Sequence, residues 1–208
     1  MVGNGILLVC LNHPDIEEIL VINRRPLNTS HPKLKEIIHQ DFFDLSQIEN
    51  QLSGYDACFY CIGVTSPFIK ESKYYEITHD LTISFASRLI RINPSMTFCY
   101  ISGLGADSQG KARFMQARVK GQTEAGLSEL PFKRVFSFRP GILKPVHGQK
   151  NVYKMYFMIM PFYPVFRLLF PGFFLTLQEL ALAMIRSVET GYNSLILEVK
   201  DIVSLAKK

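Results

Sequence analysis

The sequence predicts an α/β fold with a parallel sheet that is covered by helices on both faces. Three observations predict it. Short apolar segments alternate with segments of helical periodicity along almost the whole chain. Two apolar segments, at 55–63 and 96–102, are continuous rather than alternating, which is typical of strands buried on both faces. Glycine and polar residues follow several of the strands, where parallel α/β proteins bind their ligands.

The elements are expected in a regular order. A helix opens the chain, a strand follows at 20–23, and a loop at 26–32 leads to a short strand at 34–39. Further helices are predicted at 44–52, 74–92, 111–127 and 176–189. Further strands are predicted at 55–63, 96–102, 132–138 and 194–199, the last followed by a turn of helix. This alternation predicts βαβ units rather than separate helical and sheet domains.

Length and composition narrow the class of protein. A chain of 208 residues with 48% apolar content can form one domain with a proper core, which we expect over 1–208. The net charge of +5 fits an anionic small ligand or an acidic membrane surface. Nucleic acid is not an expected partner, because the basic residues are scattered without a long run. Without the pattern of a secretory signal at its start, the chain is expected to be cytoplasmic.

The four cysteines all lie in apolar stretches and predict reduced thiols in the core. Cys58 and Cys61 form a C-x-x-C pair, but residues three apart in a strand point to opposite faces. The pair is therefore not expected to bind a metal or to act in redox chemistry, and the sequence predicts no metal site.

Arg24 and Arg25 follow the strand at 20–23, at the distance from Gly3 where a dinucleotide-binding unit meets the adenosine ribose. An acid at this position accepts hydrogen bonds from a free 2′-hydroxyl, whereas an arginine pairs with a 2′-phosphate. Two arginines without an acid predict NADP, with NAD less favoured. The alternative is a solvated basic loop.

The glycine turn of that unit is incomplete. Gly3 fits the last glycine of a G-x-x-G-x-x-G turn, so the earlier glycines and the first strand would lie upstream of Met1. We therefore expect a Rossmann-like, doubly wound parallel sheet that lacks its first strand and the first part of its glycine motif. Asp41 is expected to accept from the adenine amino group or to cap a turn, and Gly63 to allow close approach of the cofactor ribose or to serve as a turn glycine.

Seven segments together carry a family resemblance. They are GNGILL (3–8), ILVINRRP (19–26), DF (41–42), CIGVT (61–65), YISGLGAD (100–107), ARVKG (117–121) and FRPGIL (138–143). In this order and spacing, the chain resembles the short-chain dehydrogenase/reductase superfamily. Within it, the chain resembles the atypical group of NAD(P)H-binding epimerase/dehydratase-type proteins that includes the HIV Tat-interacting oxidoreductase-like group.

The resemblance implies a catalytic set of Ser, Tyr and Lys. Ser102 matches the serine and Lys120 the lysine, which also holds the nicotinamide ribose. The tyrosine position, four residues before the lysine, is Gln116, which has no titratable proton. Either the chain binds NADP(H) and catalyses poorly, differently or not at all, or Tyr74, Tyr75 or a residue of a later lid reaches the site.

The resemblance also implies a cofactor site and a lid. The cofactor-binding residues are then Gly3, Arg24, Arg25, Asp41, Phe42, Cys61, Gly63, Lys120, Arg139, Pro140 and Gly141. Arg139–Gly141 would lie beside the nicotinamide, where Arg139 could bind an anion, or they form an ordinary turn after a strand. Residues 148–175 would form the apolar substrate-side lid.

Within the lid, the apolar and aromatic stretch at 155–166 is too short to span a bilayer and contains two prolines. Three interpretations stay open for it: the wall of an apolar substrate pocket, a membrane-surface anchor, and a partner or homodimer contact. The expected function is an NADP(H)-dependent oxidoreductase or epimerase-like enzyme for a small apolar substrate. The alternative is a non-catalytic NADP-sensing or scaffold protein, associated with a membrane surface through this stretch.

Overall fold

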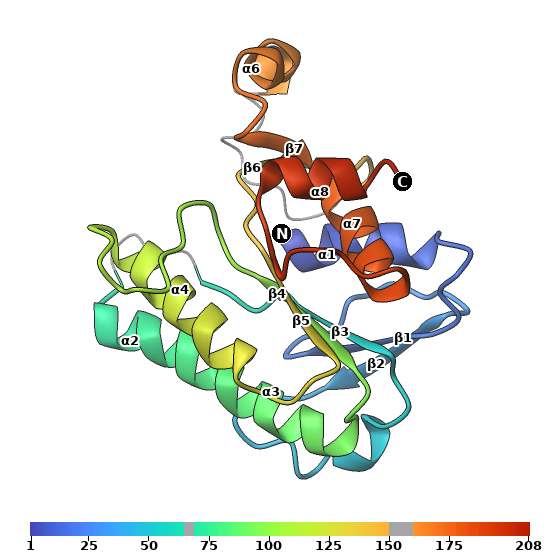
Figure 1. Cartoon of the computed structure of the whole chain (residues 1–208). Helices are drawn as coiled ribbons and strands as arrows, with labels where there is room; N and C mark the ends of the chain where they lie inside the picture. Colours follow the sequence, from blue (N-terminus) through green and yellow to red (C-terminus); the bar gives the residue numbers. More distant parts are fainter. Residues whose placement is uncertain (65–68, 150–159) are drawn as a thin grey trace.

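The computed structural model describes residues 1–64, 69–149 and 160–208, and it shows the predicted α/β architecture (Figure 1). The central sheet has four parallel strands in the order β3-β4-β5-β8. Its strands are β3 (Ala57–Tyr60), β4 (Thr97–Ile101), β5 (Arg134–Phe138) and β8 (Ile196–Leu197). Four of the five residues of β4 are buried, as its continuous apolar sequence predicts.

Two further strands, β1 (Ile19–Asn23) and β2 (Leu34–Ile38), form a separate parallel pair. At the amino ends, the Tyr55 hydroxyl donates a 2.7 Å hydrogen bond to Glu18, which ties the start of β3 to the start of β1. At the carboxyl ends, Phe42 and Tyr60 both pack on the ring of Phe85. The pair therefore runs in the same direction as β3, on the β3 side of the central sheet.

No backbone hydrogen bond joins β1 to β3 among the described residues. Every residue of β1 is half-buried, and so are three of the four residues of β3. Alternate side chains of both strands nevertheless pack against the same two cores: Ile19 and Phe59 against one, Leu20 and Cys58 against the other. The expectation that a first strand precedes Met1 stays a prediction.

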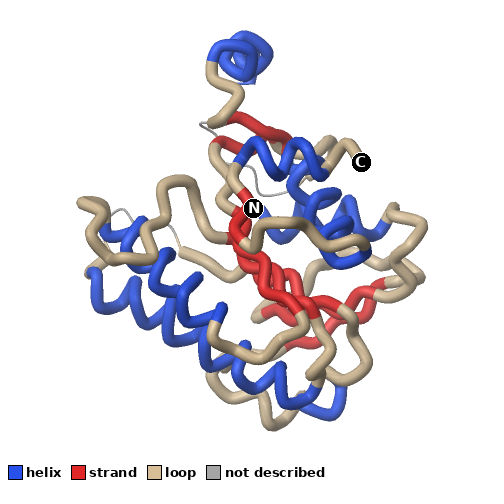
Figure 2. The backbone as a smooth tube through the Cα atoms, in the orientation of Figure 1, coloured by secondary structure: helices blue, strands red, loops and turns tan. Residues whose placement is uncertain are grey.

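Helices cover both faces of the sheet (Figure 2). One face carries α3 (Leu81–Ile92) and α4 (Met115–Ser128), with a core centred on Phe98, Tyr100 and Leu127. The other face carries α1 (Val2–Leu11), α7 (Leu177–Glu189) and α8 (Val199–Leu205). The predicted start of α7 is confirmed, because Thr176 and Glu179 form a capping box.

The helix predicted over 74–92 is longer than expected and changes its pitch. It consists of α2 (Glu71–Tyr75), a π-helical turn η2 (Glu76–Asp80) and α3. A π-helical turn within an α-helix is rare and is frequent at functional sites. Apolar periodicity does not reveal such a turn, because it inserts within a helix that remains amphipathic.

Two predicted helices differ from the structure. The segment 44–52 contains only a short 3-10 turn, η1 (Glu49–Gln51), and at its start the Asp44 carboxylate accepts from the Ser46 N–H and forms a turn instead of capping a helix. The helix predicted from residue 111 begins at Met115. The Asp107 carboxylate accepts from the backbone N–H groups of Gln109 and Lys111, and this holds the preceding residues in a turn.

Three short elements near the end of the sheet were not predicted. They are the parallel pair β6 (Ile142–Lys144) and β7 (Phe174–Thr176), and the helix α6 (Tyr163–Leu169), which follows a 3-10 turn η3 (Met160–Phe162). Residues 150–159 of the predicted lid, and Thr65 of the CIGVT segment, lie outside the described residues. Among the described helices, none has the length and apolar character to cross a bilayer.

The four cysteines are free thiols in or beside the core. Burial raises the pKa of Cys10, Cys61 and Cys99 to about 12, and it raises the pKa of Cys58 as well. At neutral pH all four are therefore protonated and poor nucleophiles.

Candidate functional site

Three strands of the central sheet end at the same edge. The register pairs Tyr60 with Tyr100 and Ile101 with Phe138, so that the residues after β3, β4 and β5 come level with one another. The Ser102 N–H donates to the Phe138 carbonyl at 2.8 Å and extends the β4–β5 ladder by one residue. This edge is where parallel α/β sheets bind ligands.

Ser102 and Lys120 meet at this edge. The Lys120 ammonium on α4 donates a short hydrogen bond to the Ser102 carbonyl oxygen. The Ser102 side chain is buried, and its hydroxyl has no hydrogen-bond partner within the described residues. Burial lowers the pKa of Lys120 to about 8, while Glu124 on the next turn of the helix works in the opposite direction. A lysine whose pKa is lowered by burial thus contacts the backbone of a residue whose own hydroxyl is buried and unpaired among the described residues.

The loop after Ser102 approaches α4 very closely, and glycines permit this approach. A Cβ on Gly103 would come within 3.2 Å of Lys120 Nζ. A Cβ on Gly121 would come within 2.0 Å of the Asp107 backbone, whose N–H donates to the Ala117 carbonyl at 2.9 Å. The ARVKG segment therefore includes glycine where the loop packs on the helix.

We expect Gly121→Ala to destabilise the protein by about 1–3 kcal/mol, because the new methyl group overlaps rigid backbone. Alanine stabilises a helix interior by about 1 kcal/mol relative to glycine. The sign of the stability change in Gly121→Ala therefore shows whether the clash outweighs this gain. Gly126→Ala on the same helix is the matched control, since its methyl group meets side chains, those of Ile83 and His79, and no backbone. Urea unfolding that shows equal stability changes in the two variants would contradict the close approach.

Arg139 is occupied by two carboxylates. Its guanidinium makes a double hydrogen bond with Glu124, at 2.9 and 2.6 Å, and a further bond of 2.9 Å with Glu198. Glu124 lies on α4 and Glu198 is the N-cap residue of α8, so the arginine connects β5 to helices on both faces. The predicted anion-binding role would require this ion-pair network to open.

The helix α1 begins beside the end of β3. A Cβ on Gly3 would come within 3.1 Å of Cys61 Cβ, so this glycine permits close packing of helix on strand. The adjacent Asn4 has a buried side-chain oxygen without a hydrogen-bond partner among the described residues. The start of α1 thus offers an unpaired polar atom at the edge that also holds Ser102.

Arg24 and Arg25 are exposed in the bend after β1. Neither takes part in a salt bridge within the described residues. The Arg24 carbonyl accepts a 2.8 Å hydrogen bond from the Gln40 amide, which ties this bend to the loop after β2. In that loop, an Asp41 carboxylate oxygen accepts from the Phe43 N–H at 2.9 Å and so forms a turn.

The other predicted cofactor residues lie along the same edge in different surroundings. The Phe42 ring is half-buried against His39 and Phe85. Gly63 is exposed, and no described residue lies within 4 Å of a Cβ built on it. A Cβ on Gly141 would overlap the Phe173 carbonyl, so this glycine serves the approach of two backbone segments, next to the buried Pro140.

Comparison with curated proteins gives two related sequences. The rat protein HTATIP2 is 27% identical over 143 residues, which are 68% of this chain and 58% of that protein. The mitochondrial protein fmp52 of Emericella nidulans is 28% identical over 149 residues, which are 69% of this chain and 63% of that protein. The matched region therefore spans less than two thirds of either relative. No family model matches the sequence.

Solved structures give the same fold. UDP-N-acetylglucosamine 4-epimerase from Bacillus cereus has a TM-score of 0.65 and 14% identity, with 98% of this chain and 79% of that chain covered. ADP-L-glycero-D-manno-heptose-6-epimerase from Helicobacter pylori has a TM-score of 0.64 and 14% identity, with 100% and 78% covered. The architecture is thus that of Rossmann-fold epimerases. The chain is thus similar to the HTATIP2-like atypical short-chain dehydrogenases/reductases in sequence and to Rossmann-fold epimerases in fold.

The general acid–base position implied by the resemblance to this group is Gln116, an exposed residue on the first turn of α4. The tyrosines considered as substitutes lie elsewhere. Tyr74 is 2% exposed, and burial raises the pKa of its hydroxyl. The Tyr75 ring stacks on His79, with centroids 4.5 Å apart. Tyr74 is therefore not arranged as an accessible proton donor, and the ring of Tyr75 is engaged with His79.

The sequence did not predict a group of buried hydroxyls near the π-helical turn η2. The hydroxyls of Tyr60, Thr78 and Tyr100 are buried without a hydrogen-bond partner among the described residues. The Thr78 carbonyl, on η2, accepts from Thr82 at 2.6 Å and from Thr123 on α4. The apolar strands place Tyr60 and Tyr100 in the core. No sequence pattern indicates that a π-helical turn lies near them.

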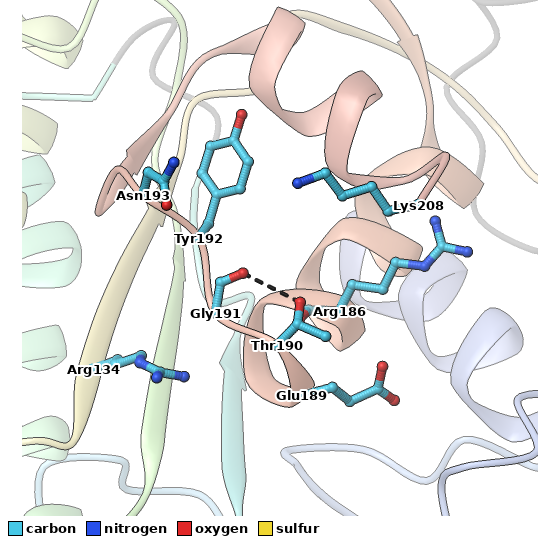
Figure 3. A pocket seen from close by; sticks show the side chains of 8 residues that line it. All are labelled: Arg134, Arg186, Glu189, Thr190, Gly191, Tyr192, Asn193 and Lys208. Carbon is cyan, nitrogen blue, oxygen red and sulfur yellow. Dashed lines mark hydrogen bonds between the residues drawn. The ribbon is translucent and has the colours of Figure 1, made fainter.

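Two other polar features of the chain lie at the opposite edge of the sheet. An open cavity of about 580 Å³ is lined by residues at the end of α7, by Arg134 at the start of β5 and by Lys208 (Figure 3). It carries charges of both signs, from Arg134, Arg186 and Lys208 and from Glu189. This cavity is separate from the carboxyl-end edge that holds Ser102.

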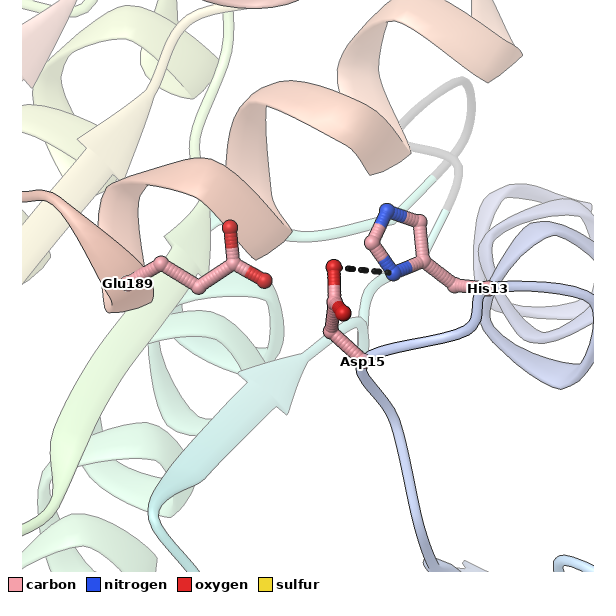
Figure 4. Close-up of side chains that lie close together, drawn as sticks. All are labelled: His13, Asp15 and Glu189. Carbon is pink, nitrogen blue, oxygen red and sulfur yellow. Dashed lines mark ion pairs between the residues drawn. The ribbon is translucent and has the colours of Figure 1, made fainter.

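The second feature is a group of possible metal ligands at the junction of α1 and α7 (Figure 4). Side-chain ligand atoms of His13, Asp15 and Glu189 lie within 4.8 Å of one another, and His13 Nδ1 is 3.7 Å from Asp15. Both carboxylates are exposed. We interpret the group as a surface ion pair with a neighbouring acid.

Proposed function

We propose that the chain binds NADP(H) and acts as an oxidoreductase or epimerase-like enzyme on a small apolar substrate. The observation that carries the proposal is the meeting of Ser102 and Lys120 at the carboxyl ends of the strands. A buried amine with a pKa lowered to about 8 and a buried hydroxyl without a partner are more costly to fold than apolar residues. Such groups are typical of sites that bind a ligand.

Two observations support a nicotinamide nucleotide as the cofactor. The Bordetella bronchiseptica enzymes WbmH and WbmG, solved in complex with NAD+ or NAD, share the fold with TM-scores of 0.61 and 0.62. Here, Arg24 and Arg25 are exposed after β1 and form no salt bridge among the described residues, which favours a cofactor with a 2′-phosphate. The nearby Glu36 carboxylate is engaged by the Asn23 side chain and the Leu27 N–H. Asn4 at the start of α1 adds an unpaired oxygen for a polar group of the ligand.

Each residue then has a separate task. A bound nicotinamide supplies or accepts hydride. Lys120 holds the nicotinamide ribose, and the Ser102 hydroxyl donates a hydrogen bond to the substrate oxygen. The remaining proposed cofactor contacts are Gly3, Asp41, Phe42, Cys61, Gly63, Arg139, Pro140 and Gly141. For Arg139, binding requires exchange of a carboxylate partner for the ligand.

A second candidate function is a non-catalytic NADP-sensing or scaffold protein. Gln116 favours it, because an amide cannot take the part of the tyrosine in proton transfer. The two candidates differ in turnover rather than in cofactor binding. Reduction of carbonyl substrates that is lost in Lys120→Ala would exclude the scaffold. A cytoplasmic location and a homodimer stay predictions under either candidate.

We expect Arg24→Ala/Arg25→Ala to weaken NADPH binding by roughly 10- to 100-fold and to change NADH binding much less. The difference follows from the loss of charge-assisted hydrogen bonds to a 2′-phosphate, which NADH lacks. Titration of the chain with each nucleotide, followed by nucleotide fluorescence, measures both dissociation constants.

The matched control is Arg91→Ala/Lys133→Ala, which removes the same charge from two exposed positions elsewhere. It should leave the preference for NADPH intact. Equal weakening of NADPH and NADH in the Arg24/Arg25 variant would refute the 2′-phosphate assignment.

A further inference from the structure

The helix α6 stands away from the other helices and from the central sheet (Figure 1). Six large apolar residues on it and beside it are 52–81% exposed, with Leu168 the most exposed. We call them the α6 apolar face: Phe162, Val165, Leu168, Leu169, Phe170 and Phe173. So many neighbouring exposed apolar residues mark an interaction surface.

The opposite side of α6 is fixed to the body. Tyr163 is buried and packs edge-on against Phe174, and Phe166 stacks on the same ring at 5.8 Å. Arg167 donates two hydrogen bonds, of 3.1 and 2.5 Å, to the Glu179 carboxylate. Because Glu179 also belongs to the capping box of α7, α6 is tied to a well-defined helix start, and its apolar face points outward.

The charge of this region is one-sided. From residue 140 to residue 178 the sequence has no Asp or Glu, while it has Lys144, Lys150, Lys154 and Arg167. Of these four basic residues, Arg167 is paired with Glu179, the first acid after the segment. Lys144 is exposed, and its ammonium lies 5.2 Å from the centre of the Tyr163 ring, at the base of α6.

We propose that the α6 apolar face binds the surface of an anionic membrane. A short helix with exposed Phe and Leu and with lysines in its flanking sequence can insert its apolar side chains among lipid headgroups and acyl chains, while Lys144 at its base meets lipid phosphates. A second copy of the chain fits less well, because pairing two α6 faces would bring two basic segments together. The proposal does not depend on nucleotide binding.

The test uses the absence of tryptophan from the sequence. In Leu168→Trp, a single tryptophan on the α6 apolar face reports its own surroundings. We expect its emission to shift to shorter wavelength, and to be quenched by brominated acyl chains, when vesicles with about 30% phosphatidylserine are added. At least tenfold weaker binding is expected for pure phosphatidylcholine or at high salt, because several basic residues each contribute to attraction.

Leu195→Trp is the matched control, because Leu195 is 51% exposed but lies outside the α6 apolar face. Its emission should not change with vesicles. As a second readout, Leu168→Glu/Leu169→Glu should abolish flotation of the chain with anionic vesicles without changing its melting temperature. Unchanged Leu168→Trp emission would overturn the proposal. So would sedimentation showing a dimer that this double variant separates, which would assign the face to a second copy.

Discussion

Replacing Arg139 by methionine should lower the free energy of unfolding by about 3–5 kcal/mol. The Arg139 side chain is 14% exposed and its partner Glu124 only 3%, so the substitution leaves a carboxylate buried without its counter-ion. A buried charge without a partner is far less favourable than a pair. The effect should exceed that of removing a surface ion pair, because water does not solvate Glu124 in its place.

The matched control is Lys35→Met, which breaks an ion pair with Glu18 in which both side chains are well exposed. Its loss of stability should be much smaller. The double variant Arg139→Met/Glu124→Leu should recover most of the loss, since it removes both charges and keeps apolar volume in place. Urea unfolding of the four proteins at pH 7 measures these differences, and a loss below about 1 kcal/mol for Arg139→Met would contradict the buried pair.

The central strands were predictable because strands buried on both faces consist almost entirely of apolar and aromatic residues. The strand β4 shows this: each of Phe98, Cys99 and Tyr100 is apolar or aromatic, since helices cover both faces of the sheet there. The pair β6 and β7 was missed because each strand has three residues, too few for an alternating pattern to appear. Its pairing depends on the close approach of Gly141 to Phe173, which are far apart in the sequence.

The site was predictable to the extent that its residues follow strands. Ser102 follows a recognisable strand, and the resemblance located Lys120 on the next helix. The partners of Arg139 were not predictable, because Glu124 and Glu198 are 15 and 59 residues away along the chain. Charged residues at such separations show no local pattern, so the sequence left Arg139 free to bind an anion where the structure pairs it.

Replacing Lys120 by methionine should stabilise the protein at pH 7 while it weakens nucleotide binding. Burial lowers the pKa of Lys120 from its ordinary value of 10.5 to about 8. At pH 7 the folded protein therefore holds a buried ammonium that is better solvated in the unfolded chain. This disadvantage amounts to at most about 3 kcal/mol, and loss of the hydrogen bond to the Ser102 carbonyl opposes the gain. We expect a net gain of about 1–2 kcal/mol.

The pH dependence gives the sharper test. Between pH 8 and 10.5 the unfolded chain binds more protons at this lysine than the folded protein does, so this lysine makes wild-type stability rise with pH in that window. Lys120→Met lacks this contribution, and its advantage should shrink to zero or reverse by pH 10.5. The control Lys200→Met removes an exposed lysine and should show no such trend.

Urea unfolding of the three proteins at pH 7, 9 and 10.5 measures these differences. A variant that is less stable than wild type by the same amount at all three values would show that Lys120 serves only as a structural hydrogen-bond donor. A stabilised variant that no longer binds NADPH would instead show that the fold keeps an unfavourable buried amine for the sake of its ligand.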